Sequence, residues 1–212
     1  MAAALVVVAL LLRSEGGSGP EPIPNPVVEL GGIPQDGAVL GRPAANVTLI
    51  EFADPQCPGC RFYTVSVFPA IVNEYIRPGN VKTEFRGFPF IGPDSVKALR
   101  FILAAGLQDR LWQFQEALYR YQGAENDGWV TDELIRQRAG EIDGLDVERL
   151  FTDANSDEMA KAAEDSAAEA EAAGIGATPT FFIRIGDGEP YVIQVGIDLD
   201  QLRAALDDAL TS

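Results

Sequence analysis

The sequence predicts an α/β domain in which a block of helices interrupts a single sheet. Three observations predict it. Residues 47–53 form an apolar, strand-like run, residues 180–195 read as a strand followed by a hairpin, and residues 93–174 between them show apolar positions at helical spacing. Because strand-like segments lie on both sides of the helices, we expect the helices to be an insertion into one domain.

Residues 47–53 are expected to form the central strand of this sheet. Apart from Thr48 and Glu51, the run is apolar at every position, on both of its alternating faces. A strand of this kind is buried on both sides, as in a parallel or mixed sheet covered by helices. A second strand is expected over residues 81–86.

A helix is expected over residues 61–75, where apolar residues recur at helical spacing from Phe62 onward. Pro69 is expected to kink it, because proline removes an internal hydrogen bond. A second amphipathic helix, over residues 199–210, is expected to close the chain.

The helical block carries recognisable start and stop signals. Thr131 and Asp146 are the expected N-terminal caps of two of its helices. Asn155 and Glu158 have the spacing of a capping box for a long helix that stops at Gly174.

The chain before residue 38 is expected to lie outside the domain, which we place at residues 38–212. Residues 1–13 contain an apolar run shorter than the roughly 17 residues that a membrane-spanning helix needs. They are either a signal peptide or membrane anchor whose basic start is missing from this sequence, or a stray apolar tail. The first alternative implies export, secreted or tethered by the N-terminus, where disulfides persist. Residues 14–37 predict a Pro/Gly-rich linker with a turn-rich end, including a short edge strand at 27–30.

Composition narrows the function classes. The net charge of −16 argues against binding nucleic acid, because phosphates require a basic surface. The absence of histidine excludes Ser-His-Asp and Cys-His catalysis and any histidine-ligated metal site. With two cysteines, an all-cysteine zinc site could form only between two chains.

The two cysteines, Cys57 and Cys60, stand between the central strand and the following helix. A Cys-x-x-Cys pair at such a junction indicates redox chemistry. The alternative is a structural disulfide, but so small a loop contributes only about 2 kcal/mol. If the helix begins at Pro58, Cys57 is its N-cap, and its sulfur accepts hydrogen bonds from the amides of Gly59 and Cys60. These contacts lower a thiol pKa, so we expect Cys57 to be the attacking and leaving sulfur and Cys60 the resolving one.

Several motifs resemble the DsbA-like branch of the thioredoxin superfamily, and the BdbD-like, membrane-tethered oxidases best. They are Glu51-Phe52-x-Asp54-x-x-Cys57-Pro58-x-Cys60, Trp112-x-Phe114 with Ala117-Leu118, Gly144-Leu145-Asp146, and the cis-proline-like loop at residues 174–182. The resemblance covers about residues 38–210. It implies a thioredoxin-like fold with a helical insertion between the second strand and the cis-proline strand.

The resemblance also implies site residues. Thr178-Pro179 would be a cis peptide facing the Cys57 sulfur, with Pro58, Gly59, Thr178 and Pro179 contacting the substrate; the alternative is an ordinary trans proline at a strand start. DsbA itself has a histidine at the position of Gly59, so a weaker oxidant than DsbA is expected. The family also more often has glycine where this chain has Ala177.

Glu51 lies six residues before Cys57, where the family often carries a buried glutamate. A carboxylate in an apolar strand is costly unless it is protonated or has a task. We expect a raised pKa and a role in passing protons to or from Cys60. The alternatives are a solvated edge position or a structural ion pair.

The implied function is a thiol:disulfide oxidoreductase that introduces disulfides into exported proteins, with no cofactor beyond the Cys57–Cys60 disulfide. Its implied partners are reduced or unfolded exported proteins and a quinone-linked membrane oxidase of the DsbB or VKOR type. Two alternatives remain: a disulfide reductase or isomerase on the same fold, and a peptide-binding or chaperone module whose cysteines are incidental.

Overall fold

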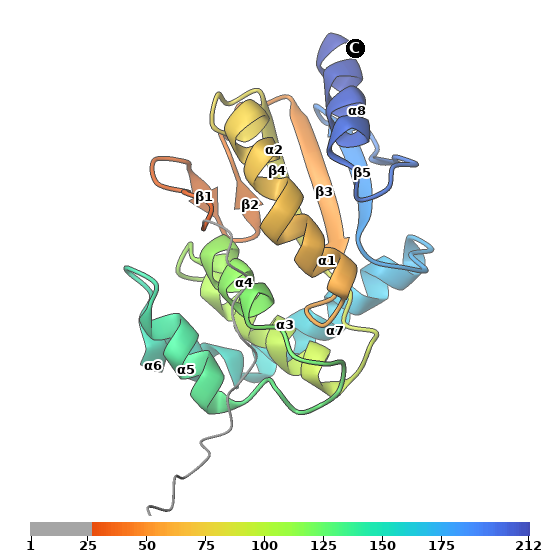
Figure 1. Cartoon of the computed structure of the whole chain (residues 1–212). Coiled ribbons are helices and arrows are strands. Elements are labelled where there is room, and N and C mark those ends of the chain that lie inside the picture. The colour runs from red at the N-terminus through yellow and green to blue at the C-terminus, as the bar shows by residue number, and fades with distance from the viewer. Residues whose placement is uncertain (1–26) are drawn as a thin grey trace, which may run out of the picture.

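The computed structural model describes residues 27–212, in which a mixed sheet is covered by helices on both faces (Figure 1). The sheet is six-stranded, with the order β1-β2-β4-β3-β5-β6. Its strands are β1 Gln35–Asp36, β2 Val39–Leu40, β3 Val47–Ala53, β4 Val81–Gly87, β5 Thr180–Ile185 and β6 Tyr191–Val192. Central β3 runs parallel to β4 and antiparallel to β5. The predicted α/β fold with a central strand at 47–53 is therefore confirmed.

All seven residues of β3 are buried. Leu49 and its neighbours on one face join the main core, with the helical segment that follows β3 and the C-terminal helix α8 Leu199–Thr211. Ile50 and Phe52 on the other face pack with Ala170 of the helical block. Covering both faces explains why the strand carries almost no polar residue.

The helical segment after β3 consists of four consecutive pieces: α1 Pro58–Phe62, η1 Tyr63–Val67, α2 Phe68–Ile71 and η2 Val72–Ile76. The disruption expected at Pro69 takes the form of a π turn just before it, closed by a bond from the Phe68 N–H to the Tyr63 carbonyl. Proline cannot donate to the preceding turn and its ring clashes there, and a π turn relieves the conflict by adding a residue.

The helical insertion lies between β4 and β5, as predicted. Its helices are α3 Pro93–Gly106, α4 Leu111–Arg120, α5 Asp132–Gly140, α6 Val147–Ala154 and α7 Asp157–Ala172. Thr131 and Asp146 cap α5 and α6, as predicted. The predicted cap at Asn155 is wrong by one position: Ser156 caps α7, because the Asn155 side chain is bonded to the Phe151 carbonyl at the end of α6.

Residues 27–37, the lead-in that precedes the predicted domain, differ from expectation in structure and in packing. Residues 27–30 form no strand, yet Val28, Leu30 and Ile33 are buried in the main core. The Val28 N–H donates to Glu116 Oε1 at 3.1 Å, so a contact with α4 replaces strand pairing. The lead-in therefore packs onto the domain from Val28 onward, which corrects the expectation that the chain before residue 38 lies outside it.

The N-terminal apolar segment and most of the linker fall outside the described residues. Within residues 27–212, no helix combines the length and the apolar character that crossing a bilayer requires.

Candidate active site

Cys57 is the N-cap of α1, as predicted. Its backbone is extended, Pro58 occupies the start of the helix, and the Cys60 N–H donates to Cys57 Sγ at 3.5 Å. Cys57 is 8% exposed and Cys60 is fully buried. Both residues are buried free thiols, and Cys57 is the more accessible of the two.

The loop before β5 lies against Cys57. The Thr178-Pro179 peptide is cis, which confirms the expectation drawn from the resemblance and excludes the trans alternative. The Cys57 thiol donates to the Thr178 carbonyl at 3.2 Å. Gly59 packs here too: a Cβ at this position would lie 3.0 Å from Ile197 Cδ1 and 3.2 Å from Pro179 Cδ, so the site favours glycine.

The surroundings separate the pKa values of the two thiols. Hydrogen bonding from the Cys60 side chain, aided by Thr178 and by the backbone amides of Cys60 and Gly59, lowers the pKa of Cys57 to about 6 despite partial burial. Burial raises the pKa of Cys60 well above its ordinary value, and its hydrogen bond to Cys57 and the charge of Glu51 add to this rise. Near neutral pH, these shifts favour the thiolate form of Cys57 and the thiol form of Cys60.

Glu51 is 1% exposed in the middle of the sheet. Burial, and secondarily the charge of Cys57, raise the pKa of Glu51 to about 8, which confirms the predicted rise. Its Oε1 atom has no hydrogen-bond partner among the described residues. The solvated edge position and the structural ion pair are therefore both wrong for this residue.

A polar network that the sequence did not reveal anchors the loop between β3 and α1. The buried Asp54 carboxylate accepts the Gln56 N–H at 2.7 Å, the Ile91 N–H at 3.0 Å and the Ser95 hydroxyl at 2.5 Å. The Gln56 side chain donates to Ser95 Oγ at 3.0 Å and to Asn126 Oδ1 at 3.1 Å, and accepts the Asn126 N–H at 2.7 Å. The start of the helical insertion and a loop within it thus hold the loop that carries Cys57.

Two further residues, at and just beyond the end of α4, contact this loop. The Tyr119 hydroxyl donates to the Asp54 carbonyl at 2.9 Å. The Gln122 side-chain amide donates to the Pro55 carbonyl at 2.9 Å and to the Cys57 carbonyl at 3.2 Å. The one sequence signal for this network was the pair of polar residues, Asp54 and Gln56, directly after an apolar strand.

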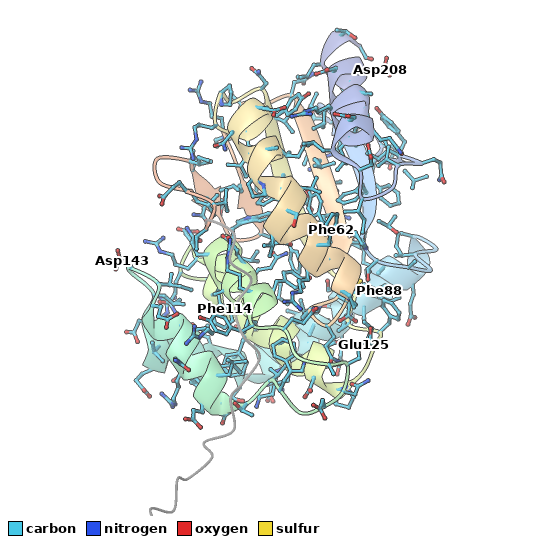
Figure 2. All side chains as sticks on the ribbon, in the orientation of Figure 1. Phe62, Phe88, Phe114, Glu125, Asp143 and Asp208 are labelled. Atoms are coloured by element: carbon cyan, nitrogen blue, oxygen red, sulfur yellow. The ribbon has the colours of Figure 1, made fainter. Side chains whose placement is uncertain are left out.

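An exposed aromatic side chain lies on the helix that begins after Cys57. Phe62, expected on the core face of its helix, is 52% exposed and is the last residue of α1, the helix that Cys57 caps; Figure 2 labels it. Phe90, in the loop after β4, is 49% exposed and stacks on Phe88. Large apolar side chains at the surface often mark a contact site for another molecule.

Comparison with known proteins identifies relatives. The family model described as thioredoxin matches residues 34–208. The probable disulfide bond formation protein D of Bacillus anthracis is 32% identical over 81% of this chain and 77% of its own length. The disulfide bond formation protein D of Bacillus subtilis is 28% identical over 81% of this chain and 76% of its own.

A solved structure agrees with these relatives. The crystal structure of oxidised BdbD from Bacillus subtilis matches with a TM-score of 0.74 at 26% identity, covering 92% of this chain and 98% of that one. The thioredoxin match spans the whole sheet, the helical insertion and the Cys57–Cys60 pair. The chain therefore belongs to the thioredoxin family, in its DsbA-like group, and is a thiol:disulfide oxidoreductase.

Proposed function

We propose that the protein oxidises pairs of thiols in exported proteins by disulfide exchange through Cys57 and Cys60. The observation that carries the proposal is the contrast between the two sulfurs. The pKa of the more accessible Cys57 is lowered to about 6, while burial raises the pKa of Cys60. A stabilised thiolate on Cys57 favours the reduced form of the protein, and so makes its disulfide an oxidant.

In the first step, a substrate thiolate attacks Cys57 Sγ of the disulfide. A substrate–Cys57 disulfide forms, the Cys57–Cys60 bond breaks, and Cys60 leaves with the electron pair. Because its pKa is raised, Cys60 then takes a proton. Glu51, protonated near neutral pH and electrostatically coupled to both cysteines, is the proposed proton source.

In the second step, the other thiolate of the substrate attacks its own sulfur in the mixed disulfide. The substrate disulfide forms, the substrate–Cys57 bond breaks, and Cys57 leaves as a thiolate. Its low pKa makes it a good leaving group. The substrate has then lost two electrons and the protein has gained them as a dithiol.

The substrate is proposed to lie across Pro58, Gly59, Thr178 and Pro179, with an extended segment along the Thr178 backbone. Pro58 is exposed and the other three are half-buried around Cys57, which leaves room for a neighbouring peptide. Phe62 adds an apolar contact for the unfolded segments in which reduced cysteines occur.

Recovery of the disulfide requires an oxidant. A quinone-linked membrane thiol oxidase of the DsbB or VKOR type is the proposed acceptor of the two electrons. Export of the protein, secreted or tethered through residues 1–13, would bring it to the compartment where such oxidases and reduced exported proteins meet.

The test is the oxidative refolding of a reduced, unfolded substrate by the oxidised protein. Cys57→Ser is expected to abolish disulfide formation. A Cys60→Ser protein that carries glutathione as a mixed disulfide on Cys57 is expected to react with a substrate that has a single thiol, releasing glutathione and accumulating the substrate–Cys57 disulfide. Oxidative refolding by Cys57→Ser at the wild-type rate would overturn the proposal.

A further inference from the structure

Gln122 is a buried glutamine that reaches from the helical insertion to the active-site loop. It is 4% exposed and lies two residues after the end of α4. Its side-chain nitrogen donates to the carbonyl oxygens of Pro55 at 2.9 Å and of Cys57 at 3.2 Å, across 67 and 65 positions of sequence. The side-chain amide of Gln122 thus bonds to the loop on both sides of Gln56.

The Cys57 carbonyl oxygen accepts two hydrogen bonds, one of them from Gln122. The other comes from the Arg61 N–H at 3.1 Å and is the first bond within α1. A carbonyl so close to the sulfur places the negative end of a peptide dipole near any thiolate. A second donor on the same oxygen neutralises part of that dipole and fixes the direction in which the peptide points.

The Pro55 carbonyl oxygen accepts the second hydrogen bond from Gln122. It lies in the same buried loop, where an unpaired carbonyl is costly. Asp54 and Gln56 are fixed independently, by Ser95 and Asn126. Gln122 is therefore one of several side chains that hold this loop, and its distinctive contact is with the Cys57 peptide.

We propose that Gln122 is a positioning residue for thiol–disulfide exchange, which holds the Cys57 peptide so that the sulfur stays at the start of α1 and against the Thr178 loop. The proposal rests on the proposed function, in which Cys57 is the reacting sulfur. It gives the helical insertion a role in tuning the redox centre, because Gln122 belongs to that insertion.

Other groups also act on Cys57. The titratable side chains around it are Glu51 on β3, Asp54 in the loop, Cys60 on α1 and Tyr119 on α4. None of them is bonded to Gln122 among the described residues, so removing its amide leaves their direct contacts in place.

The experiment replaces Gln122 by methionine, which keeps the length of the side chain and removes the donor. Gln115→Met is the matched control, because Gln115 is a glutamine of α4 that is 1% exposed and makes no side-chain hydrogen bond among the described residues. The readouts are the Cys57 thiolate pKa, from the pH dependence of alkylation, and the redox equilibrium with glutathione.

In Gln122→Met, we expect the Cys57 pKa to rise by about half a unit to one unit. The equilibrium constant for oxidising glutathione should fall by about three- to tenfold, because a less stable thiolate makes a weaker oxidant. Gln115→Met should match the wild type in both. A folded Gln122→Met protein with the wild-type pKa and equilibrium constant would overturn the inference.

If the proposed function itself were wrong, the wild-type protein would show an ordinary Cys57 pKa, which is a different result from an unchanged pKa in Gln122→Met. A measurement on the wild-type protein also covers the case in which Gln122→Met does not fold. The side-chain amide resonances of Gln122 should shift with the same midpoint as the Cys57 titration. Resonances that stay unchanged while Cys57 ionises would overturn the inference.

Discussion

The Sγ atom of Cys57 lies 3.2 Å from the carbonyl oxygen of Thr178, a residue 121 positions further along the chain. This contact joins the start of α1 to the cis-proline loop. The Thr178 hydroxyl has no hydrogen-bond partner among the described residues, and the Thr178 side chain helps to lower the pKa of Cys57. The hydroxyl is therefore available to donate to a thiolate.

Replacing Thr178 by valine removes that donor and keeps the shape of the side chain. We expect the Cys57 pKa to rise by about half a unit to one unit, measured by alkylation between pH 4 and 9. Thr180→Val is the control, because its hydroxyl donates to the Ala177 carbonyl instead. A pKa equal to that of the wild type would refute the role given to the Thr178 hydroxyl.

Replacing Glu51 by glutamine tests the buried carboxyl through stability. The pKa of Glu51 is raised to about 8 in the folded protein from an ordinary 4.5. Between these values the unfolded chain ionises at Glu51 and the folded one does not. The Glu51 contribution to stability is thus undiminished below pH 4.5 and is lost as pH rises toward 8.

Glu51→Gln removes this loss. At pH 7 we expect the reduced variant to be more stable than the wild type by up to about 3 kcal/mol, with a difference that shrinks toward pH 4.5. Urea unfolding across that range measures it, with Glu189→Gln in the exposed hairpin turn as control. Equal stability at pH 7 would show that Glu51 titrates normally. Slower exchange in Glu51→Gln at pH 7 would then support the proton-transfer role.

Replacing Phe62 by serine tests the substrate surface. We expect KM for an unfolded substrate to rise about three- to tenfold, since a half-exposed phenyl ring can still bury substantial apolar area. The Cys57 pKa and kcat should stay at wild-type values. Leu107→Ser is the control. Leu107 is 49% exposed, but it lies at the C-terminal end of α3, whereas Ser95, which contacts the active-site loop, lies at the N-terminal end. An unchanged KM would exclude Phe62 from substrate contact.

The parts of the site that depend on neighbouring residues were predictable from the sequence. Cys57 as N-cap follows from the proline next to it, and the raised pKa of Glu51 follows from the apolar strand around it. The central strand and the insertion were predictable for the same reason, because hydrophobic periodicity is a local signal.

The parts that depend on distant contacts were not predictable. Gln122 and Asn126 are polar residues in a loop, and nothing near them in sequence indicates that they meet Gln56 or Cys57. The cap at Ser156 was missed because two adjacent polar residues competed for one position. The burial of Val28 depends on a partner in α4 that the local pattern does not name.

The most direct test of the proposed function is the redox equilibrium of the Cys57–Cys60 pair with glutathione, combined with the Cys57 thiolate pKa. The expected result is a potential between about −230 mV and the about −120 mV of DsbA, with a pKa near 6. A potential near the about −270 mV of thioredoxin, with an ordinary thiol pKa, would contradict it and make the protein a reductase.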